Sequence, residues 1–369
     1  MIQFSASMKS SNPPLDRNQP VEGMWLARHR DSNAWYHIYP IARSKQTSVL
    51  HVVRHQMVNH DIPKVHYHLY KSSGLVPDLV KIFFKGFFTL LSYDIKFIVT
   101  FNPVPWGTVA WILAKLFRKP IILGFIGADF NHYLKNTKWK SFLLYASRHS
   151  DIITVTGKNM KDYFEYIGIS KDKLFVYPHC VKDDLFIDST NEQSSFDVIT
   201  VCNLIPRKRV QDIIRAVSCL KQKGKAINLC IVGDGEERPM LENLSKSQGV
   251  GDNVHFMGWQ TNVLFYLKQS KLYVQASSSE GFSISLIEGI AAGLIPITTK
   301  AGSEEDHIKH DFNGFFFDVG DYISLASLIE FSLKEENYKR IRLNVLKQRE
   351  YFRTENAINI CNEIIERIK

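Results

Sequence analysis

The chain has few cysteines, no long apolar run and no leader-like start. Its five cysteines lie far apart, are odd in number and show no metal or redox spacing, so we expect reduced thiols in the core. Residues 1–20 are polar and contain prolines, unlike a signal peptide. Nowhere do the roughly 18 apolar residues of a spanning helix follow one another. These absences predict a cytoplasmic protein.

The signatures of nucleic-acid binding are missing as well. The sequence has no zinc spacing, no basic region followed by heptads and no aromatic RNA-binding motif. The net charge is nevertheless +9, and all of the excess lies in residues 1–185. A basic half of this kind suits anionic lipid headgroups or a phosphate-bearing substrate. We expect no nucleic-acid partner, and contact with an anionic membrane surface stays open.

The alternation of apolar and amphipathic segments predicts an α/β protein with two Rossmann-like domains. The 369 residues are enough for two such domains, and a polar segment at 184–196 is the candidate linker. Two open parallel sheets bind a ligand where the carboxyl ends of their strands face each other. Strands are expected at 48–54, 96–101, 121–126, 151–156, 174–177, 197–202, 228–232, 253–257, 272–275 and 295–299. One long charged helix is expected from about residue 335 to residue 369.

The segment 278–289, Ser-Ser-Glu-Gly-Phe-Ser-Ile-Ser-Leu-Ile-Glu-Gly, has the pattern of a ligand site. A helix starts around Ser283, where free backbone N–H groups suit a phosphate, and Gly281 lets the backbone approach a ligand. Glu288 lies between apolar helix residues, where an ionised carboxylate needs polar partners such as the two hydroxyls of a ribose. On this pattern alone, a solvated Glu280 and a salt-bridged Glu288 are equally good interpretations.

With its flanks, this segment resembles the retaining glycosyltransferases of family 4, which have the two-domain B-type fold. The resemblance consists of Glu280-Gly281-Phe282, a second Glu after seven residues, and the tail Glu-Gly-Ile-Ala-Ala-Gly-Leu-Ile-Pro at 288–296. It implies that Glu280 contacts the donor sugar, that Glu288 holds the ribose, and that Gly281, Phe282 and Ser283 line the donor site. It further implies an acceptor domain over 1–185, a nucleotide-sugar domain over 186–345, and a helix at 346–369 that packs back on the first domain.

A second similarity is the segment 201–209, Val-Cys-Asn-Leu-Ile-Pro-Arg-Lys-Arg. The family usually has Arg at the position of Asn203, Lys at that of Lys208 and Gly at that of Arg209. Its Arg and Lys neutralise the diphosphate. Lys208 is retained, but Asn203 carries no charge. Either Arg207 or Arg209 compensates, or each is a solvated residue at a helix start.

Weaker similarities add further candidates. Gly233 and Gly235 resemble a strand-end Gly-x-Gly that leaves room for the nucleotide, although a tight turn explains them equally well. Trp259 is expected either to stack in the base pocket or to cap the core. Asp129 resembles an aspartate near the acceptor, with a helix N-cap as the alternative.

The first strand lacks the Gly-Gly loop that the family usually has there. We expect a strand at 23–27 and a loop at 28–32, in which Arg28 and Arg30 supply the charge that Asn203 lacks. The segment 75–91 contains four phenylalanines together with lysines. It is either a core helix or an amphipathic helix in the membrane interface.

The resemblance implies a metal-independent, retaining hexosyltransferase. It would move a sugar from a UDP- or GDP-linked donor to a glycan or lipid-linked acceptor in surface polysaccharide synthesis, with no further cofactor. Two alternatives stay open. One is a sugar-nucleotide epimerase on the same fold, and the other is a non-catalytic member that binds a partner.

Overall fold

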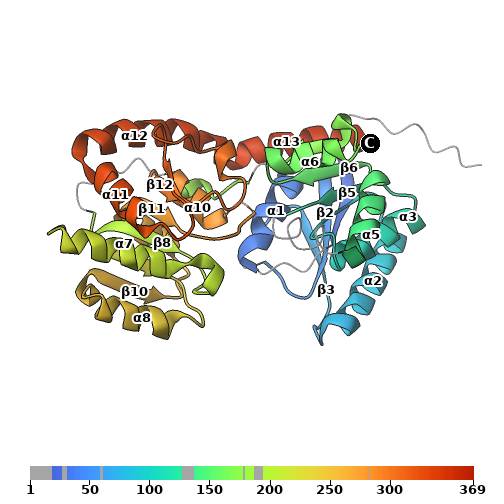
Figure 1. Cartoon of the computed structure of the whole chain (residues 1–369). Helices are drawn as coiled ribbons and strands as arrows, with labels where there is room; N and C mark the ends of the chain where they lie inside the picture. The colour runs from blue at the N-terminus through green and yellow to red at the C-terminus, as the bar shows by residue number, and fades with distance from the viewer. Residues whose placement is uncertain are drawn as a thin grey trace, which may run out of the picture.

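The structure is a computed structural model that describes residues 19–26, 31–58, 61–126, 137–177, 179–186, 194–281 and 283–369, except for the side chains of 31–33 and 137. It has two lobes side by side, each built on one parallel sheet (Figure 1). The predicted pair of Rossmann-like sheets is confirmed.

The N-terminal lobe contains a seven-stranded sheet in the order β3-β2-β1-β4-β5-β6-β7. Its strands are β1 (Val21–Leu26), β2 (Thr47–Arg54), β3 (Val65–Leu69), β4 (Ile95–Phe101), β5 (Ile121–Gly124), β6 (Ile152–Val155) and β7 (Leu174–Val176). Its helices are α1 (Asp31–Arg43), α2 (Leu75–Ser92), α3 (Trp106–Leu116), α5 (Thr137–Arg148) and α6 (Lys158–Tyr166). The interior strands are buried along their length because helices cover the sheet.

The C-terminal lobe contains a six-stranded sheet in the order β10-β9-β8-β11-β12-β13. Its strands are β8 (Phe196–Val201), β9 (Leu229–Val232), β10 (Val254–Gly258), β11 (Ser270–Gln275), β12 (Ile295–Thr298) and β13 (Phe315–Phe316). Its helices are α7 (Val210–Gln222), α8 (Arg238–Ser247), α9 (Val263–Lys268), α10 (Ile284–Ala291), α11 (Tyr322–Leu333) and α12 (Glu335–Gln348).

The expected strands all form, within a few residues of their predicted ends. Strands β3 and β13 were not expected, because β3 is a half-exposed edge strand with histidines at alternate positions and β13 has only two residues. The single long helix from 335 to 369 is wrong. The chain leaves α12 for the 3₁₀ turn η6 (Arg349–Phe352) and then forms α13 (Thr354–Ile368), since Arg349 and Phe352 turn inward and are buried.

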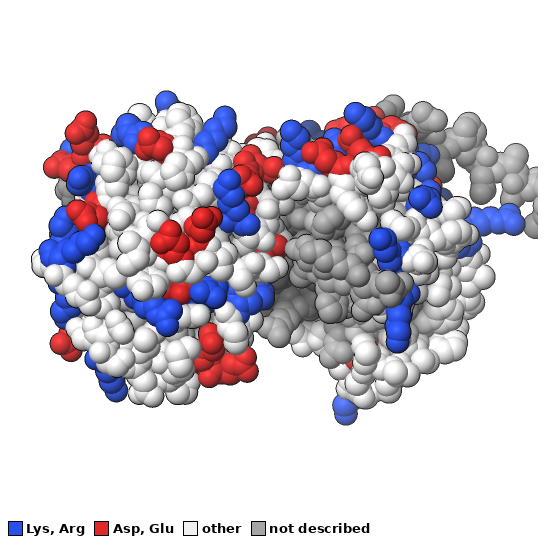
Figure 2. Space-filling view, viewed as in Figure 1, with Lys and Arg blue, Asp and Glu red and all other residues white. Residues whose placement is uncertain are grey.

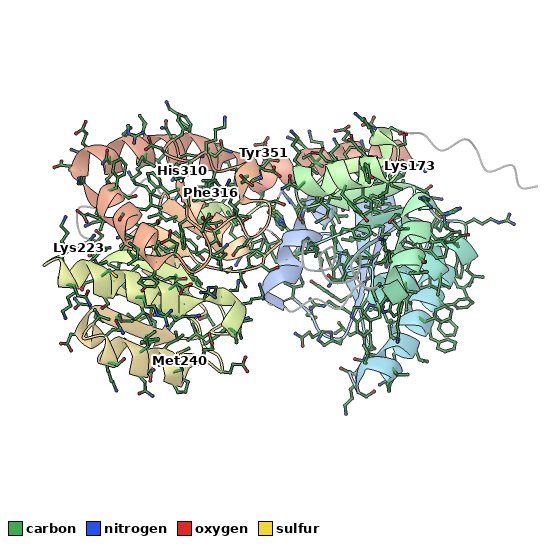
Figure 3. The ribbon with its side chains drawn as sticks, viewed as in Figure 1. Lys173, Lys223, Met240, His310, Phe316 and Tyr351 are labelled. Atoms are coloured by element: carbon green, nitrogen blue, oxygen red, sulfur yellow. The ribbon has the colours of Figure 1, made fainter. Side chains whose placement is uncertain are left out.

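The two segments that connect the lobes lie against each other. The backbone N–H of Val181 donates to the carbonyl of Phe352 at 3.1 Å, and the Thr354 hydroxyl donates to Asp183 Oδ2 at 2.9 Å. Tyr351, in η6, lies at this junction (Figure 3). The two connecting segments are therefore packed against each other at the junction between the lobes.

Helix α13 packs on the N-terminal lobe. Asn362 Oδ1 accepts hydrogen bonds from the hydroxyl of Ser44 and the backbone N–H of Lys45, both at 2.8 Å. The Arg367 guanidinium donates to the carbonyl of Asp172 at 2.9 Å. The end of the chain thus closes over the first lobe, as Figure 1 shows. Among the described helices, none has the length and hydropathy needed to cross a bilayer.

Candidate active site

The carboxyl ends of the two sheets face each other across the junction. Tyr36, in the helix after β1, donates its hydroxyl to Glu288 Oε1 of α10 at 2.6 Å. The backbone N–H of Lys158, just after β6, donates to Asp306 Oδ2 at 2.6 Å. Asp306 belongs to η5 (Glu304–Asp306), which follows β12. The predicted ligand position between the domains therefore lies where strand ends of both lobes meet.

A cluster of three charged residues lies at the carboxyl ends of β8 and β11. Glu280 Oε1 accepts a short hydrogen bond from the Lys208 ammonium, and Glu280 Oε2 lies 3.0 Å from Arg207 Nη1. The side chains of Glu280 and Lys208 are 9% and 11% exposed. Burial alone would raise the pKa of Glu280, but the two cations outweigh it and lower this pKa below its ordinary value. Glu280 is thus an ionised, nearly buried carboxylate.

Backbone contacts between two loops hold this cluster. The N–H of Glu280 donates to the carbonyl of Ala301 at 2.9 Å, and the N–H of Ser303 donates to the carbonyl of Gly281 at 2.9 Å. A Cβ at Gly302 would lie 1.9 Å from the oxygen of Gly281, so only glycine fits there. The loop after β12 therefore fixes the position of Glu280.

Arg207, and not Arg209, joins the cluster. Arg207 also donates to the carbonyl of Ser279 at 2.8 Å. Arg209 has a left-handed backbone, with φ 50° and ψ 41°, and its Nε donates to the buried Asp212 at 2.7 Å. The left-handed conformation explains why glycine is usual at this position. The donor contact predicted for Arg209 stays a prediction, and so does compensation by Arg207 for the charge that Asn203 lacks.

Asn203 lies in a loop that packs tightly on the end of β9. A Cβ at Gly233 would lie 1.9 Å from the carbonyl oxygen of Cys202, and one at Gly235 would lie 2.4 Å from that of Leu204. The loop backbone therefore needs both glycines, whether or not a nucleotide also passes there. Asn203 itself is half-buried, and its carbonyl accepts from the backbone N–H of Ile205 at 3.0 Å.

Glu288 lies one and a half turns into α10, on the face that meets the N-terminal lobe. Burial raises its pKa above the ordinary range, although the hydrogen bond from Tyr36 opposes this. Burial and the neighbouring Glu288 both raise the pKa of Tyr36, so its phenol stays protonated and remains a donor. Ser283 precedes the helix, and its hydroxyl lies 3.0 Å from that of Ser285.

Comparisons with known proteins agree with this geometry. Residues 181–351 match the family model described as glycosyl transferases group 1. The chain is 26% identical over 273 residues to N-acetyl-alpha-D-glucosaminyl L-malate synthase of Bacillus anthracis, covering 69% of this chain and 70% of that protein. It is 28% identical over 271 residues to a Campylobacter jejuni alpha-1,4-N-acetyl-D-galactosaminyltransferase, covering 72% and 74%. The structure of Anabaena HepE in complex with UDP and glucose aligns with a TM-score of 0.76 at 17% identity, over 93% of this chain and 98% of that one.

Residues 181–351 of the chain belong to the glycosyl transferases group 1 family. It is a glycosyltransferase of the retaining, metal-independent B type that uses a nucleotide-sugar donor, as the sequence resemblance implied. The glycosyltransferase is therefore confirmed, and the sugar-nucleotide epimerase is not. The B-type fold is confirmed by the alignment across both lobes.

A third carboxyl group of this glycosyltransferase was not assigned a role from the sequence. Glu304 is fully buried, and its Oε2 accepts from the backbone N–H of Gly302 at 2.6 Å. Burial raises its pKa to about 7, and the nearby charge of Glu280 acts in the same direction. The signal in the sequence was the position of Glu304 directly after Gly302 and Ser303. These two residues pack against the loop of Glu280.

One of the remaining predicted site residues, Trp259, lies in the described part of the chain. Trp259 is 66% exposed, so it does not cap the core, and base stacking stays a prediction. Asp129, Phe282, Arg28 and Arg30 lie outside the described residues. Their predicted roles in this glycosyltransferase also stay predictions.

Proposed function

We propose that this glycosyltransferase moves a sugar from a UDP-sugar to a lipid-linked glycan at a membrane surface. Glu280 would accept hydrogen bonds from hydroxyls of the donor sugar, and Glu288 from the ribose. Lys208 and Arg207 would face the diphosphate. The observation that carries the proposal is the nearly buried cluster of Glu280 with these two cations at the strand ends.

The chemistry requires stabilisation of the leaving group. The bond between the anomeric carbon and the β-phosphate oxygen breaks, so negative charge develops on the diphosphate. The acceptor hydroxyl attacks from the same face, and the departing β-phosphate oxygen takes its proton. A cation that is already positioned in a nearly buried site stabilises that charge more than one in water does. Lys208 is such a cation, because the hydrogen bond to Glu280 fixes its ammonium.

The relatives support the choice of donor and acceptor. The HepE structure contains UDP and glucose, which supports a uridine nucleotide. The name of the Campylobacter relative describes an acceptor glycan linked to PP-undecaprenol, which supports a lipid-linked acceptor. Such an acceptor stays in a membrane, so the enzyme must reach the membrane surface.

Helix α2 supports membrane contact. Its outer face exposes apolar side chains at regular spacing: Leu75, Val76, Val80, Phe84, Phe88 and Leu91, each between 51% and 68% exposed. Lys81 and Lys85 lie on the same helix, and Lys115 follows on α3. In Figure 1 these two helices lie on the side of the N-terminal lobe away from the other lobe. In Figure 2 the described part of that lobe has basic side chains along its right side, and basic and acidic ones together at its top.

This arrangement suits an interfacial helix. The apolar face would enter the headgroup region, and the lysines would contact anionic lipid. The inner face is already occupied, because Ile82 and Leu90 are buried against the sheet. The core interpretation of segment 75–91 therefore applies to the inner face of α2, and the proposed membrane contact applies to its outer face.

The donor assignment is tested by a screen of nucleotide sugars for release of the nucleoside diphosphate. UDP-linked donors should give release that needs a lipid-linked acceptor, and Glu280→Gln and Glu288→Gln should abolish it. Release from GDP donors alone would overturn the choice of UDP. No release from any donor, together with no binding of UDP, would favour the non-catalytic alternative.

The membrane assignment is tested by flotation with vesicles. The wild type should float with vesicles that contain phosphatidylglycerol and less with neutral ones. Phe84→Ser combined with Phe88→Ser should abolish flotation. Phe265→Ser, at a phenylalanine of α9 that is 55% exposed, is the matched control and should leave flotation unchanged. Flotation that is equal for both variants would overturn the role of α2.

A further inference from the structure

Three histidines of the N-terminal lobe meet on one face of its sheet. His51 lies on β2, and His66 and His68 lie on the edge strand β3. In the parallel register His51 is paired with His66, and Val53 with His68. Residues two apart on a strand point to the same face, so this register brings all three imidazoles together.

The ring nitrogens are close enough to share one ion. One nitrogen from each of the three histidines lies within 4.8 Å of the others. His51 Nδ1 and His68 Nε2 are 2.9 Å apart, a hydrogen-bond distance. Two nitrogens bound tetrahedrally to Zn²⁺ at about 2.0–2.1 Å lie roughly 3.4 Å apart, so small side-chain rotations convert this contact into a pair of ligands.

A carboxylate stands behind the most buried histidine. His51 Nε2 lies 3.4 Å from Glu22 Oε2 on the neighbouring strand β1. Within the described part of the chain, both atoms are buried and neither has a hydrogen-bond partner. Metal-bound imidazoles commonly donate their second N–H to a carboxylate, which fixes the tautomer and strengthens the ligand. Glu22 is in position for that role toward His51.

The surroundings form a shell of the kind that metal sites have. The ring of Tyr93, at the end of α2, lies 4.2 Å from the ring of His51 by centroid distance. Val53 and Met24, on the same face of the sheet, belong to the apolar cluster beneath α2. His51 is buried and His66 is exposed, so an ion can enter from solvent at His66.

We propose that His51, His66 and His68 bind a divalent transition-metal ion, with Zn²⁺ as the best match to three imidazoles, and that Glu22 positions His51. A water molecule would complete the coordination. The site lies beneath α2, whereas Tyr36 of α1 belongs to the apolar cluster on the opposite face of the sheet. The ion is therefore separate from the transfer reaction. Its effect is to join the edge strand β3 to β2 below the helix proposed to contact the membrane.

The test is a Zn²⁺ titration of the full-length, untagged, chelator-treated protein against a chromophoric competitor. We expect one equivalent to bind, and Co²⁺ to give the intense visible bands of a tetrahedral site. His66→Gln changes an exposed ligand and should fold normally, yet lower the affinity by at least about tenfold. Glu22→Gln should lower it by a similar factor, because it removes the partner of His51.

A histidine of the other lobe provides the matched control. His255→Gln, on β10 of the other lobe, removes a histidine outside the cluster and should leave the titration unchanged. Circular dichroism of each variant checks the fold. Less than one equivalent bound to the wild type, or equal affinity for the wild type and His66→Gln, would show that the three rings only pack and hydrogen-bond with each other.

Discussion

The two lobes contribute to the active site in different ways. The C-terminal lobe supplies charged side chains that its own loops fix, as the backbone contacts around Glu280 show. The described contribution of the N-terminal lobe is the hydroxyl of Tyr36 and the backbone of Lys158. A nucleotide diphosphate is common to many donors, whereas acceptors differ. If the C-terminal lobe binds the donor, as proposed, the diphosphate that many donors share meets side chains that backbone contacts hold in place.

The largest expected effect concerns the charge cluster of the C-terminal lobe. Lys208→Met should lower kcat/KM by about 100-fold or more, because the leaving diphosphate loses a cation that was already in position. Initial rates at several donor concentrations give this value. Lys225→Met is the control, since Lys225 pairs with Glu330 outside the site. A loss below about threefold would mean that the cluster is structural and that the lobes differ less than we propose.

A second effect concerns Glu304, which lies in the loop that holds Glu280 and not in the charge cluster itself. The pKa of Glu304 is raised from 4.5 to about 7 in the folded state. Between these values the folded protein keeps a proton that the unfolded chain releases. The contribution of Glu304 to the free energy of unfolding is therefore fully present below the lower value and is lost as the pH rises through about 7, by up to about 3 kcal/mol.

Unfolding in urea across that pH range measures this effect. Glu304→Gln cannot titrate at this position, so its free energy of unfolding should fall less steeply than that of the wild type. Glu305→Gln, at the exposed neighbour, should keep the wild-type slope. Equal slopes for the wild type and Glu304→Gln would show that Glu304 is ionised at pH 5 in the folded state.

A smaller effect tests the link between the lobes. In the proposed function the ribose diol binds the carboxyl group of Glu288, which accepts the hydrogen bond from Tyr36. Tyr36→Phe should therefore tighten UDP binding by up to about tenfold, the value of one hydrogen bond to a charged group. Calorimetric titration with UDP measures it. Tyr39→Phe, on the same helix and stacked on Trp35, is the control. Weaker binding by Tyr36→Phe would instead mean that this phenol contacts the nucleotide.

The sequence predicted the C-terminal lobe better than the N-terminal one. Strands β9 and β12 form within one residue of their predicted ends, and the predicted site residues Glu280 and Lys208 lie in contact. These features depend on local patterns and on a strand-end position that parallel sheets fix. Strand β3 was missed because alternating histidines on a half-exposed edge do not resemble a buried strand.

Long-range contacts explain the remaining differences. The partner of Glu288 is Tyr36, which is 252 positions away, and no local pattern indicates this pairing. The break at η6 was missed because Arg349 and Phe352 are buried by residues far away in the sequence; Arg349 Nη1, for example, donates to the carbonyl of Ala291 at 3.3 Å. For the same reason, no local pattern indicates that Arg207 contacts Glu280 whereas Arg209 pairs with Asp212.

The smallest expected effect is at Arg209, where this chain departs from the family. Glycine there would relieve the left-handed backbone, by about 1 kcal/mol, but would remove one ion pair of the buried Asp212. Arg215, at 3.6 Å, would remain near that carboxylate. Because these groups do not contact Glu280, Arg209→Gly should change the donor KM by less than about twofold, whereas Arg207→Ala should raise it more. If Arg209→Gly raised KM as much as Arg207→Ala, both arginines would serve the diphosphate, and the C-terminal lobe would compensate twice for the charge that Asn203 lacks.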